Sequence, residues 1–439
     1  MNKLENSSPN VENNRTLLSG VPEGYETFLL SGPAGDNFRG REHIHVCRDA
    51  ERLEAVSEGI SFFSPKSLIL DFPAWDCLPY DRVSPQREIV SKRIDTLFWL
   101  ANHKSKWKRP VTVLTTINAV LQKISPPSFF TDLTREIAIG DVIDFEEIQV
   151  FFSQTGFERA GIVREAGDYA IRGGILDAFV PGYEFPVRIE FFGDIVEAIR
   201  FFDPITQIST RQIEKLELKP ASEYFLDEKS ISHFRSGYRR HFGSVTSDQI
   251  YTAISAGRRH VGAEHWLPLF HERMETIFDF IPDASITFDY EADKLIDNRL
   301  ALIKDYFDAR TTFLENNNSN SQITGPVYRP LPYDELYLSH AKFDKVLATC
   351  RVGQFSPFGG PGDASSSNYN IISNYEAKTI PDFAAARIQN SGGVKKEEVQ
   401  AEGLFDTLNK RLKKEVNAGK TVIVTGFSSG SLAVGFEGP

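Results

Sequence analysis

The chain has 439 residues, of which 41% are hydrophobic and 25% are charged, a composition typical of a soluble globular protein with about three domains. Its 49 Lys and Arg residues are outnumbered by 60 Asp and Glu residues, so the net charge of −11 argues against a stand-alone nucleic-acid binder. The three cysteines lie far apart without CxxC spacing, and we expect neither a disulfide framework nor a zinc site.

The sequence gives no sign of a membrane or secretion signal. The first ten residues are polar, and no run approaches the roughly 18 apolar residues that a membrane-spanning helix needs. Together with the cysteine pattern, this predicts a cytoplasmic protein with no membrane partner.

Residues 1–16 have the composition of a flexible polar tail, and residues 17–130 alternate between apolar runs and helical patterns. Strands are predicted at residues 26–31, 43–47, 67–71 and 111–115, and a helix at residues 88–101. Alternation of strands and helices indicates a parallel sheet with helices on both faces.

Residues 131–217 differ from the preceding segment, because most of their predicted elements are strands. Strands are predicted at residues 169–180, 186–192 and 195–202, separated by turn signals such as Pro181-Gly182. We expect a small α+β insert built around an antiparallel sheet. It holds 8 Lys and Arg against 17 Asp and Glu residues, and its net charge of −9 makes a protein a better partner than DNA.

The rest of the chain is predicted to form two further parts. Residues 218–315 return to helices and isolated strands, at 276–281 and 285–288, and are expected to complete the first α/β domain. Residues 316–328 resemble a polar linker. Residues 329–439 are predicted to form a small α/β third domain that is truncated, with an irregular stretch at 359–368, a helix at 397–416 and a strand at 421–425.

The segment from Gly20 to Thr27 has the frame of a phosphate-binding loop, G-x-x-x-x-G-K-[ST], without its chemistry. Gly20 and Thr27 occupy the positions of the first glycine and the hydroxyl, but Tyr25, which follows Gly24, replaces the second glycine. Glu26 replaces the lysine and would place a negative charge against the phosphates. The simpler alternative is a turn between two strands.

We find no other catalytic or metal-binding motif. Gly419-Lys420-Thr421 precedes a predicted strand instead of following one, and no apolar strand leads into the acidic pair Asp334-Glu335. The H-E-x-x-H motif is absent from the sequence, since His271-Glu272 has no second histidine at helical spacing. We therefore predict no catalytic residues, no metal site and no cofactor for this chain.

The strand predicted at residues 186–192 carries a possible binding face. Because side chains alternate along a strand, Arg188, Glu190 and Phe192 should point away from the core together. An aromatic side chain beside arginine is typical of a protein-binding hot spot. The neighbouring strand supplies Arg172, followed by two glycines that suggest a bulge or a close backbone approach. The alternatives are that Phe192 packs under a loop and that each arginine only pairs with a nearby acid.

Several segments resemble the transcription-repair coupling factors of bacteria (Mfd). The resemblance depends on residues 72–81 (FPAWDCLPYD), 167–177 (GDYAIRGGILD), 186–192 (PVRIEFF) and 264–270 (EHWLPLF). It implies a UvrB-like layout, in which a split first domain (1a and 1b) surrounds a domain that binds the repair protein UvrA. It also implies that Arg172, Arg188 and Phe192 contact UvrA and that the nucleotide loop is inactive.

The resemblance further implies a role in recruiting UvrA to stalled RNA polymerase during transcription-coupled nucleotide excision repair. RNA polymerase binding, duplex-DNA binding and an ATP- and magnesium-dependent DNA translocase are expected of other parts of the full-length protein. Two alternatives remain open for this chain: helicase-like ATP hydrolysis, and direct binding of duplex DNA by the split domain.

Overall fold

The computed structural model describes residues 15–32, 42–103, 110–133, 135–243, 248–319, 328–358, 371–375, 404–420 and 422. Contacts divide the chain into two units, Met1–Glu376 and Ala377–Pro439. The described part of the second unit is mainly helix α14 (Leu404–Asn417), which agrees with the helix predicted at 397–416. The irregular stretch at 359–368 and, except for residue 422, the strand predicted at 421–425 lie outside the described residues.

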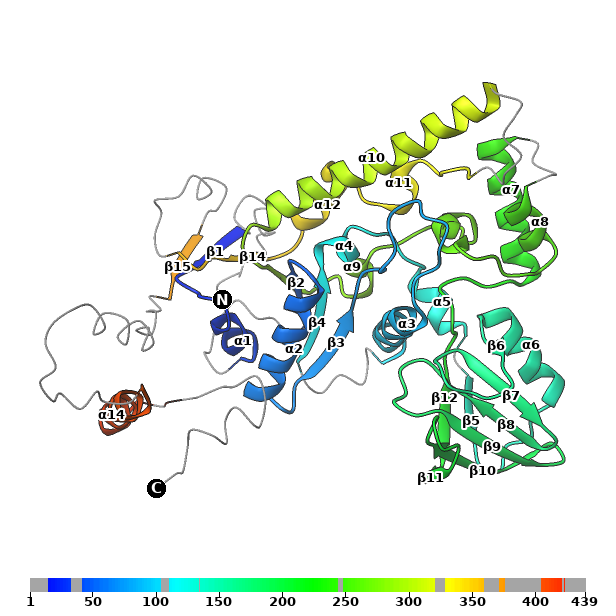
Figure 1. Cartoon of the computed structure of the whole chain (residues 1–439), viewed down its shortest axis with the longest axis horizontal. Coiled ribbons are helices and arrows are strands. Elements are labelled where there is room, and N and C mark those ends of the chain that lie inside the picture. The colour runs from blue at the N-terminus through cyan, green and yellow to red at the C-terminus, as the bar shows by residue number, and fades with distance from the viewer. Residues whose placement is uncertain are drawn as a thin grey trace, which may run out of the picture. The chain divides into compact units, whose positions relative to one another are not determined.

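A seven-stranded parallel sheet forms the centre of the first unit, in the order β15-β1-β14-β13-β2-β4-β3 (Figure 1). Its strands are β1 (Arg15–Ser19), β2 (Glu42–Cys47), β3 (Leu68–Phe72), β4 (Val111–Thr116), β13 (Ser285–Phe288), β14 (Val352–Phe355) and β15 (Ile371–Asn374). The prediction of a parallel sheet is confirmed, as are the strands predicted at 43–47, 67–71, 111–115 and 285–288.

Helices cover both faces of this sheet. The short α1 (Tyr25–Leu30) and α2 (Ala50–Phe63) pack on one face, over side chains such as Leu18, Leu114 and Phe355. The opposite face packs against α3 (Arg87–Asn102), α4 (Ile117–Val120), α9 (Ile277–Phe280) and α12 (His340–Leu347). The helix predicted at 88–101 is thus confirmed. Within the described ranges, no helix combines the length and apolarity needed to cross a membrane.

Two predicted strands are wrong, because residues 26–31 and 276–281 form the helices α1 and α9. Both are short apolar runs, whose pattern alone does not distinguish a buried helix from a buried strand. Local capping decides the outcome at α9, where Thr276 and Asp279 form a capping box. At α1, the backbone N–H of Gly24 donates to the side chain of Glu26, two residues further along the chain.

The predicted boundaries at the start of the chain and near residue 316 also differ from the structure. Arg15 and Thr16, assigned to the tail, begin strand β1, while residues 1–14 lie outside the described ranges. Helix α10 (Ala292–Ser319) extends into the predicted linker. Strands β14 and β15, predicted within a third domain that starts at residue 329, flank β1 in the first sheet. These strand pairings join segments far apart in the sequence, so local patterns do not reveal them.

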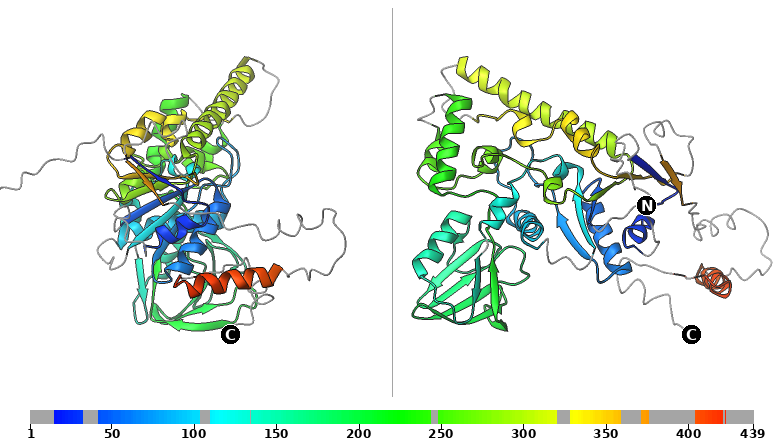
Figure 2. Two further views of the ribbon diagram at one scale, coloured as in Figure 1. Left: turned by 90° about the vertical axis from the view of Figure 1, so that its left-hand side faces the viewer. Right: turned by 180° about the vertical axis from the view of Figure 1, so that it is seen from behind.

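The insert has an antiparallel sheet in the order β11-β10-β9-β8-β7-β6, in which only the short β6–β7 pair is parallel (Figure 2). The strands are β6 (Glu158–Arg159), β7 (Asp168–Arg172), β8 (Ile175–Ala178), β9 (Val187–Phe192), β10 (Ile195–Phe202) and β11 (Ser209–Ile213). Helix α6 (Phe145–Thr155) packs on its inner face, and a two-stranded sheet pairs β5 (Arg135–Ala138) with β12 (Lys215–Leu218).

The strand predicted at residues 169–180 is two strands, β7 and β8, joined by a tight turn at Gly173-Gly174. Gly173 has a φ of 59°, and a Cβ on Gly174 would lie 2.8 Å from the carbonyl oxygen of Phe191. The close backbone approach predicted from the two glycines is therefore present, but it lies in a hairpin turn.

Buried and half-buried ion pairs join helix α3 to the segment that follows the last strand of the insert. The guanidinium of Arg93, on α3, is 2.7 Å from the carboxylate of Glu223, and both side chains are almost completely buried. On the same helix, the carboxylate of Asp95 is 2.5 Å from Lys219 Nζ. Beyond this junction, α7 (Glu228–Phe242), α8 (Gln249–Ser255) and the 3-10 helix at Ala263–Leu269 pack into an aromatic cluster with Trp75 and Trp266.

Candidate functional site

The outer face of the insert sheet brings together the three side chains predicted to bind a partner. In the strand register, Arg172 lies opposite Ile175, and Ile175 lies opposite Glu190. Arg188 and Phe192 flank Glu190 at alternate positions of β9, so all five side chains share the face that points away from α6. The grouping predicted from strand geometry is therefore present in the structure.

Phe192 lies at the surface next to the β9–β10 turn, with 78% of the residue exposed. It faces Ile195 across the hairpin, and Ile195 is itself 47% exposed. The alternative that Phe192 packs under a loop is therefore wrong. An exposed phenylalanine beside exposed isoleucine gains free energy when a partner covers it, because apolar area is removed from water.

Arg188 is held in place by its neighbours. Its Nε and Nη2 atoms donate to the two carboxylate oxygens of Asp177, at 2.7 and 2.9 Å, and its guanidinium lies 4.9 Å from the ring centre of Phe202. The hydrogen bonds to Asp177 raise the pKa of Arg188 above its ordinary value. The alternative that this arginine pairs with an acid is thus correct, although the side chain still reaches the outer surface.

Arg172 is exposed at the end of β7 and donates a hydrogen bond to the carbonyl oxygen of Gly161. The fixed Arg188, the exposed Arg172 and the apolar Phe192 lie on one face of the sheet, with Glu190 between Arg188 and Phe192 along β9. We call Arg172, Ile175, Arg188, Glu190 and Phe192 the outer face. Such a combination suits a protein surface that offers carboxylates around an apolar pocket.

The loop from Gly20 to Gly24 connects β1 to α1, so strand, loop and helix follow one another as in a phosphate-binding loop. Its amides have partners within the chain, however. Gly20 N donates to the carbonyl oxygen of Phe358 at 2.8 Å, and Val21 N to that of Ser356 at 2.9 Å. Gly24 N donates to the carboxylate of Glu26 at 2.8 Å. The turn between two strands, the simpler alternative, is wrong.

Glu26 lies inside the protein, where its carboxylate pairs with the guanidinium of Arg52 from α2. The side chain of Arg52 is only 8% exposed, and it also lies 3.4 Å from Glu23 and 3.6 Å from Asp289. Burial tends to lower the pKa of Arg52, but the charges of Glu26 and Asp289 outweigh that effect and raise it. Arg52 therefore remains a buried cation between the loop and the end of β13.

Thr27, at the hydroxyl position of the phosphate-binding frame, donates its hydroxyl hydrogen to the carbonyl oxygen of Gly24 at 2.6 Å. The ring of Tyr25 stacks on that of Phe28, with 6.0 Å between ring centres. The five predicted loop residues thus lie together, and their polar groups and rings contact other residues of the chain.

Sequence reasoning missed Arg52, Asp289 and Asp177. A signal for Asp289 was available, because an acidic residue directly after an apolar strand is the arrangement that holds magnesium in phosphate-loop enzymes. Arg52 and Asp177 carried no signal, since their roles depend on which strands and helices become neighbours.

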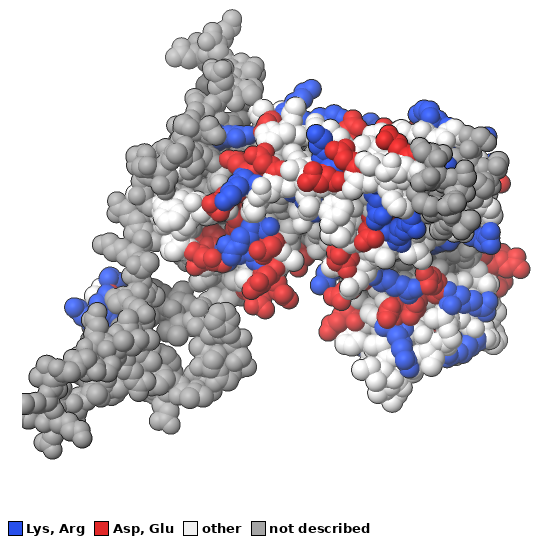
Figure 3. Space-filling model, turned by 45° about the horizontal axis from the view of Figure 1, so that its top comes forward, with Lys and Arg blue, Asp and Glu red and all other residues white. Residues whose placement is uncertain are grey.

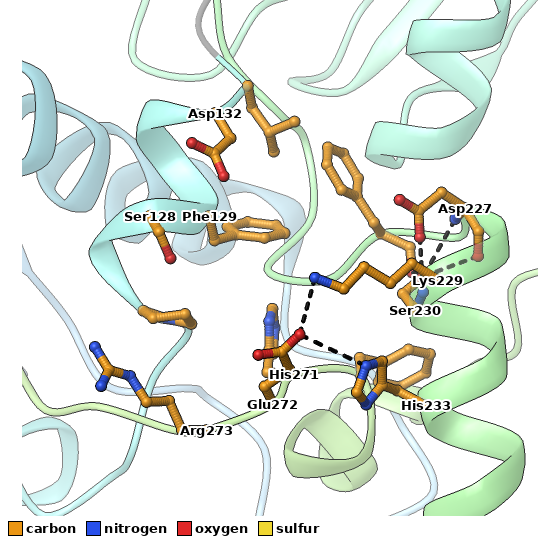
Figure 4. A pocket seen from close by; sticks show the side chains of 14 residues that line it. Ser128, Phe129, Asp132, Asp227, Lys229, Ser230, His233, His271, Glu272 and Arg273 are labelled. Atoms are coloured by element: carbon orange, nitrogen blue, oxygen red, sulfur yellow. Dashed lines mark hydrogen bonds and ion pairs between the residues drawn. The ribbon is translucent and has the colours of Figure 1, made fainter.

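A pocket of about 560 Å³ lies where the insert joins the first domain (Figure 4). Glu272 lies there 2.9 Å from Lys229 Nζ and 3.9 Å from His233 Nε2. His271 Nε2 lies 2.9 Å from the hydroxyl of Ser125, and burial lowers the pKa of His271 to about 4. Because these charges are paired within the pocket, it shows no arrangement that would activate a substrate.

The chain resembles known proteins over most of its length. Residues 136–224 match the family model described as the UvrB interaction domain. A transcription-repair-coupling factor of Haemophilus influenzae is 33% identical over 285 residues, which cover 64% of this chain and 24% of that protein. The transcription-repair-coupling factor of Rickettsia bellii is 29% identical over 415 residues, which cover 93% of this chain and 34% of that protein. That of Escherichia coli is 31% identical over 242 residues, which cover 54% of this chain and 20% of that protein.

The chain thus spans only between 20% and 34% of the length of these relatives. The matched domain overlaps the insert predicted at 131–217 and contains every residue of the outer face. The resemblance predicted from the sequence is confirmed: the chain is homologous to part of the bacterial transcription-repair-coupling factors and contains a UvrB interaction domain.

Proposed function

We propose that this chain is a recruitment module that binds UvrA through the outer face of its insert, and so brings excision repair to stalled RNA polymerase. The observation that carries the proposal is the exposed Phe192 on the same sheet face as Arg172 and Arg188, inside a domain matched by the UvrB interaction model. Repair coupled to transcription is the role that the names of the relatives indicate.

Pre-organisation supports the outer face as a binding surface. The bidentate contact with Asp177 fixes Arg188 before any partner arrives, so little side-chain entropy would be lost on binding. The outer face carries two arginines and one glutamate on an insert with a net charge of −9, and exposed Arg172 favours a partner that offers a carboxylate at this place.

The same proposal holds that the first domain neither binds nor hydrolyses ATP. In a working loop, backbone amides and a lysine surround the phosphates. Here three loop amides donate to protein oxygens, and Glu26 and Arg52 form a buried pair at the loop. A phosphate would have to displace the carboxylate of Glu26 and leave Arg52 with fewer partners.

The proposed layout is a first domain split into residues 17–130 (1a) and 218–315 (1b) around the UvrA-binding insert, followed by a third domain. The structure requires one change, since β14 and β15 pair with β1 and extend the first domain to about residue 375. We assign RNA polymerase binding, DNA translocation and the associated ATP and magnesium to regions of the longer relatives that this chain does not match.

Direct binding of duplex DNA is a weaker candidate. Figure 3 shows Lys and Arg side chains interspersed with Asp and Glu over the face that it presents, without one large basic area. Because duplex DNA is held mainly by clustered cations on its phosphates, this mixture gives little electrostatic attraction.

The test is a calorimetric titration of UvrA into the chain and its variants. Phe192→Ala and Arg188→Ala should each weaken UvrA binding by about 2 kcal/mol, or roughly thirtyfold, because each removes an anchor of the outer face. Phe62, which is 57% exposed on α2, provides the matched control. Phe62→Ala should leave the affinity unchanged. Equal affinity for UvrA of the wild type and of both outer-face variants would exclude this face.

A further inference from the structure

Three potential metal ligands meet at the end of the parallel sheet, near the loop from Gly20 to Gly24. His45 and Cys47 lie on the same face of β2, and Asp289 directly follows β13. In the register of these neighbouring strands, Thr287 is opposite His45, so Asp289 comes next to Cys47. One ligand atom of each lies within 4.8 Å of the others, and all three residues are buried.

Hydrogen bonds around His45 leave one of its ring nitrogens without a partner. His45 Nδ1 lies 2.8 Å from the hydroxyl oxygen of Thr287, which also lies 2.8 Å from His43 Nε2. The hydroxyl has one hydrogen. If it donates to His43, it must accept from His45 Nδ1–H, and His45 Nε2 then carries a lone pair. This Nε2 atom is buried and makes no hydrogen bond.

The atom that His45 Nε2 faces is a carboxylate oxygen. Asp289 Oδ1 lies 3.4 Å away. If the Thr287 hydroxyl donates to His45 Nδ1, Nε2 carries a hydrogen that faces this carboxylate. If the hydroxyl donates to His43 instead, two groups that accept hydrogen bonds face each other in the protein interior. Such a contact is unfavourable unless a cation lies between the two atoms. The cation is either a proton on His45 or a metal ion.

The buried charges close by would also favour a cation at this position. Glu26 and Asp289 are two buried carboxylates, and they share one buried guanidinium, that of Arg52. This leaves one negative charge in excess among the three. A buried charge without compensation is costly, so a cation at the His45 end of Asp289 would stabilise the cluster.

We propose that His45, Cys47 and Asp289 form a binding site for a divalent metal ion of the zinc class. Imidazole, thiolate and carboxylate are all ligands of Zn²⁺, and three protein ligands leave a fourth position for water. In tetrahedral zinc sites, neighbouring nitrogen and oxygen ligands lie roughly 3.3–3.5 Å apart. The separation of His45 Nε2 and Asp289 Oδ1 already has this value, at 3.4 Å.

The neighbours of the site suit this role. Thr287 holds the ring of His45 through Nδ1, as a second-shell acceptor does for a metal-bound histidine. The backbone N–H of Arg48 donates to Asp289 Oδ2 at 3.1 Å, which leaves Oδ1 for the metal. The ion would join β2 to the end of β13. The spacing of the cysteines gave no sign of this site, because its ligands come from two strands more than 240 residues apart in the sequence.

The experiment uses Co²⁺ as a spectroscopic substitute for zinc, added to the whole chain after treatment with a chelator. We expect one equivalent to bind, with a thiolate-to-cobalt charge-transfer band and the intense visible bands of four-coordinate cobalt. Cys47→Ser should abolish the charge-transfer band and weaken binding by at least about tenfold. Zn²⁺ should raise the melting temperature of the wild type and leave that of Cys47→Ser unchanged.

Cys77 provides the matched control, since its Sγ also lies near a histidine, 3.9 Å from His265 Nε2. Cys77→Ser should bind cobalt with the wild-type spectrum. If Cys47→Ser does not fold, X-ray absorption of the zinc-loaded wild type decides, with one sulfur and the rest nitrogen or oxygen ligands expected. The absence of tight metal binding by the wild type would overturn the proposal, as would a charge-transfer band that persists in Cys47→Ser.

Discussion

Arg52 in the first domain and Arg188 in the insert are both paired with carboxylates, but the two pairs have opposite consequences. Arg52 lies under the loop at the end of a parallel sheet, where Glu26 and Asp289 enclose it. Arg188 lies on the outer face of an antiparallel sheet, where Asp177 fixes the guanidinium and Phe192 remains uncovered at the end of the same strand.

The difference follows from the two kinds of sheet. Helices cover both faces of a parallel sheet, so charges at its end must satisfy one another inside the protein. An antiparallel sheet buries one face and leaves the other available. Comparable ion pairs can therefore lie buried beside a loop in one region and fix a side chain on an exposed sheet face in the other. In this comparison, burial decides which outcome occurs.

The largest expected effect comes from opening the buried cluster. Glu26→Ala would leave Arg52 with fewer partners and remove the acceptor of Gly24 N–H, so we expect a loss of about 3–5 kcal/mol in the free energy of unfolding. Urea unfolding followed by tryptophan fluorescence measures it. Glu23 is the control, because it contacts the same arginine but is 59% exposed.

Glu23→Ala should change the free energy of unfolding by less than about 1 kcal/mol, as expected for an exposed ion pair. Similar losses for Glu23→Ala and Glu26→Ala would mean that burial does not govern the strength of this cluster. The comparison between the two arginines would then lose its physical basis.

Much of the outer face was predictable from the sequence, whereas the buried cluster was not. Alternation along β9 is a local property, so the grouping of Arg188 with Phe192 follows from their spacing. The cluster needs α2 and β13 to meet at one loop, which only the strand order determines. The same reason explains the missed partners of β1, since β14 lies more than 300 residues further along the chain.

The second expected effect is a loss of stability of the first domain in mild acid. Burial lowers the pKa of both His265 and His271 from an ordinary 6.5 to about 4. Between about pH 6.5 and pH 4 the unfolded chain binds protons that the folded chain does not. The free energy of unfolding therefore falls as the pH falls from about 6.5 towards 4. Each histidine accounts for up to about 3 kcal/mol.

The insert matched at residues 136–224 contains no histidine and no tryptophan, so fluorescence reports on the rest of the chain. Urea unfolding at about pH 7 and about pH 5 should give a smaller pH dependence for His271→Gln than for the wild type. His260→Gln, at a half-exposed position, should retain the wild-type dependence. An unchanged slope in His271→Gln would show that this side chain is not kept neutral by burial.

The smallest expected effect concerns Asp177, the partner of Arg188. Asp177→Ala leaves a guanidinium that is 18% exposed without its carboxylate, at a cost of about 1–3 kcal/mol to the insert. Hydrogen exchange of β8 and β9 should quicken, while exchange in the parallel sheet should not change. The double variant with Arg188→Met should recover part of the loss, because the unpaired charge is removed as well.

Asp177→Ala also tests the outer face, if the proposed binding of UvrA holds. Without Asp177, Arg188 is present but no longer fixed, so UvrA should bind more weakly than to the wild type and more tightly than to Arg188→Ala. An affinity equal to that of the wild type would mean that pre-organisation does not contribute. A loss of stability as large as that of Glu26→Ala would instead place the Arg188 pair in the same class as the buried cluster. The greater exposure of Arg188, 18% against 8% for Arg52, would then make no difference to the cost of breaking the pair.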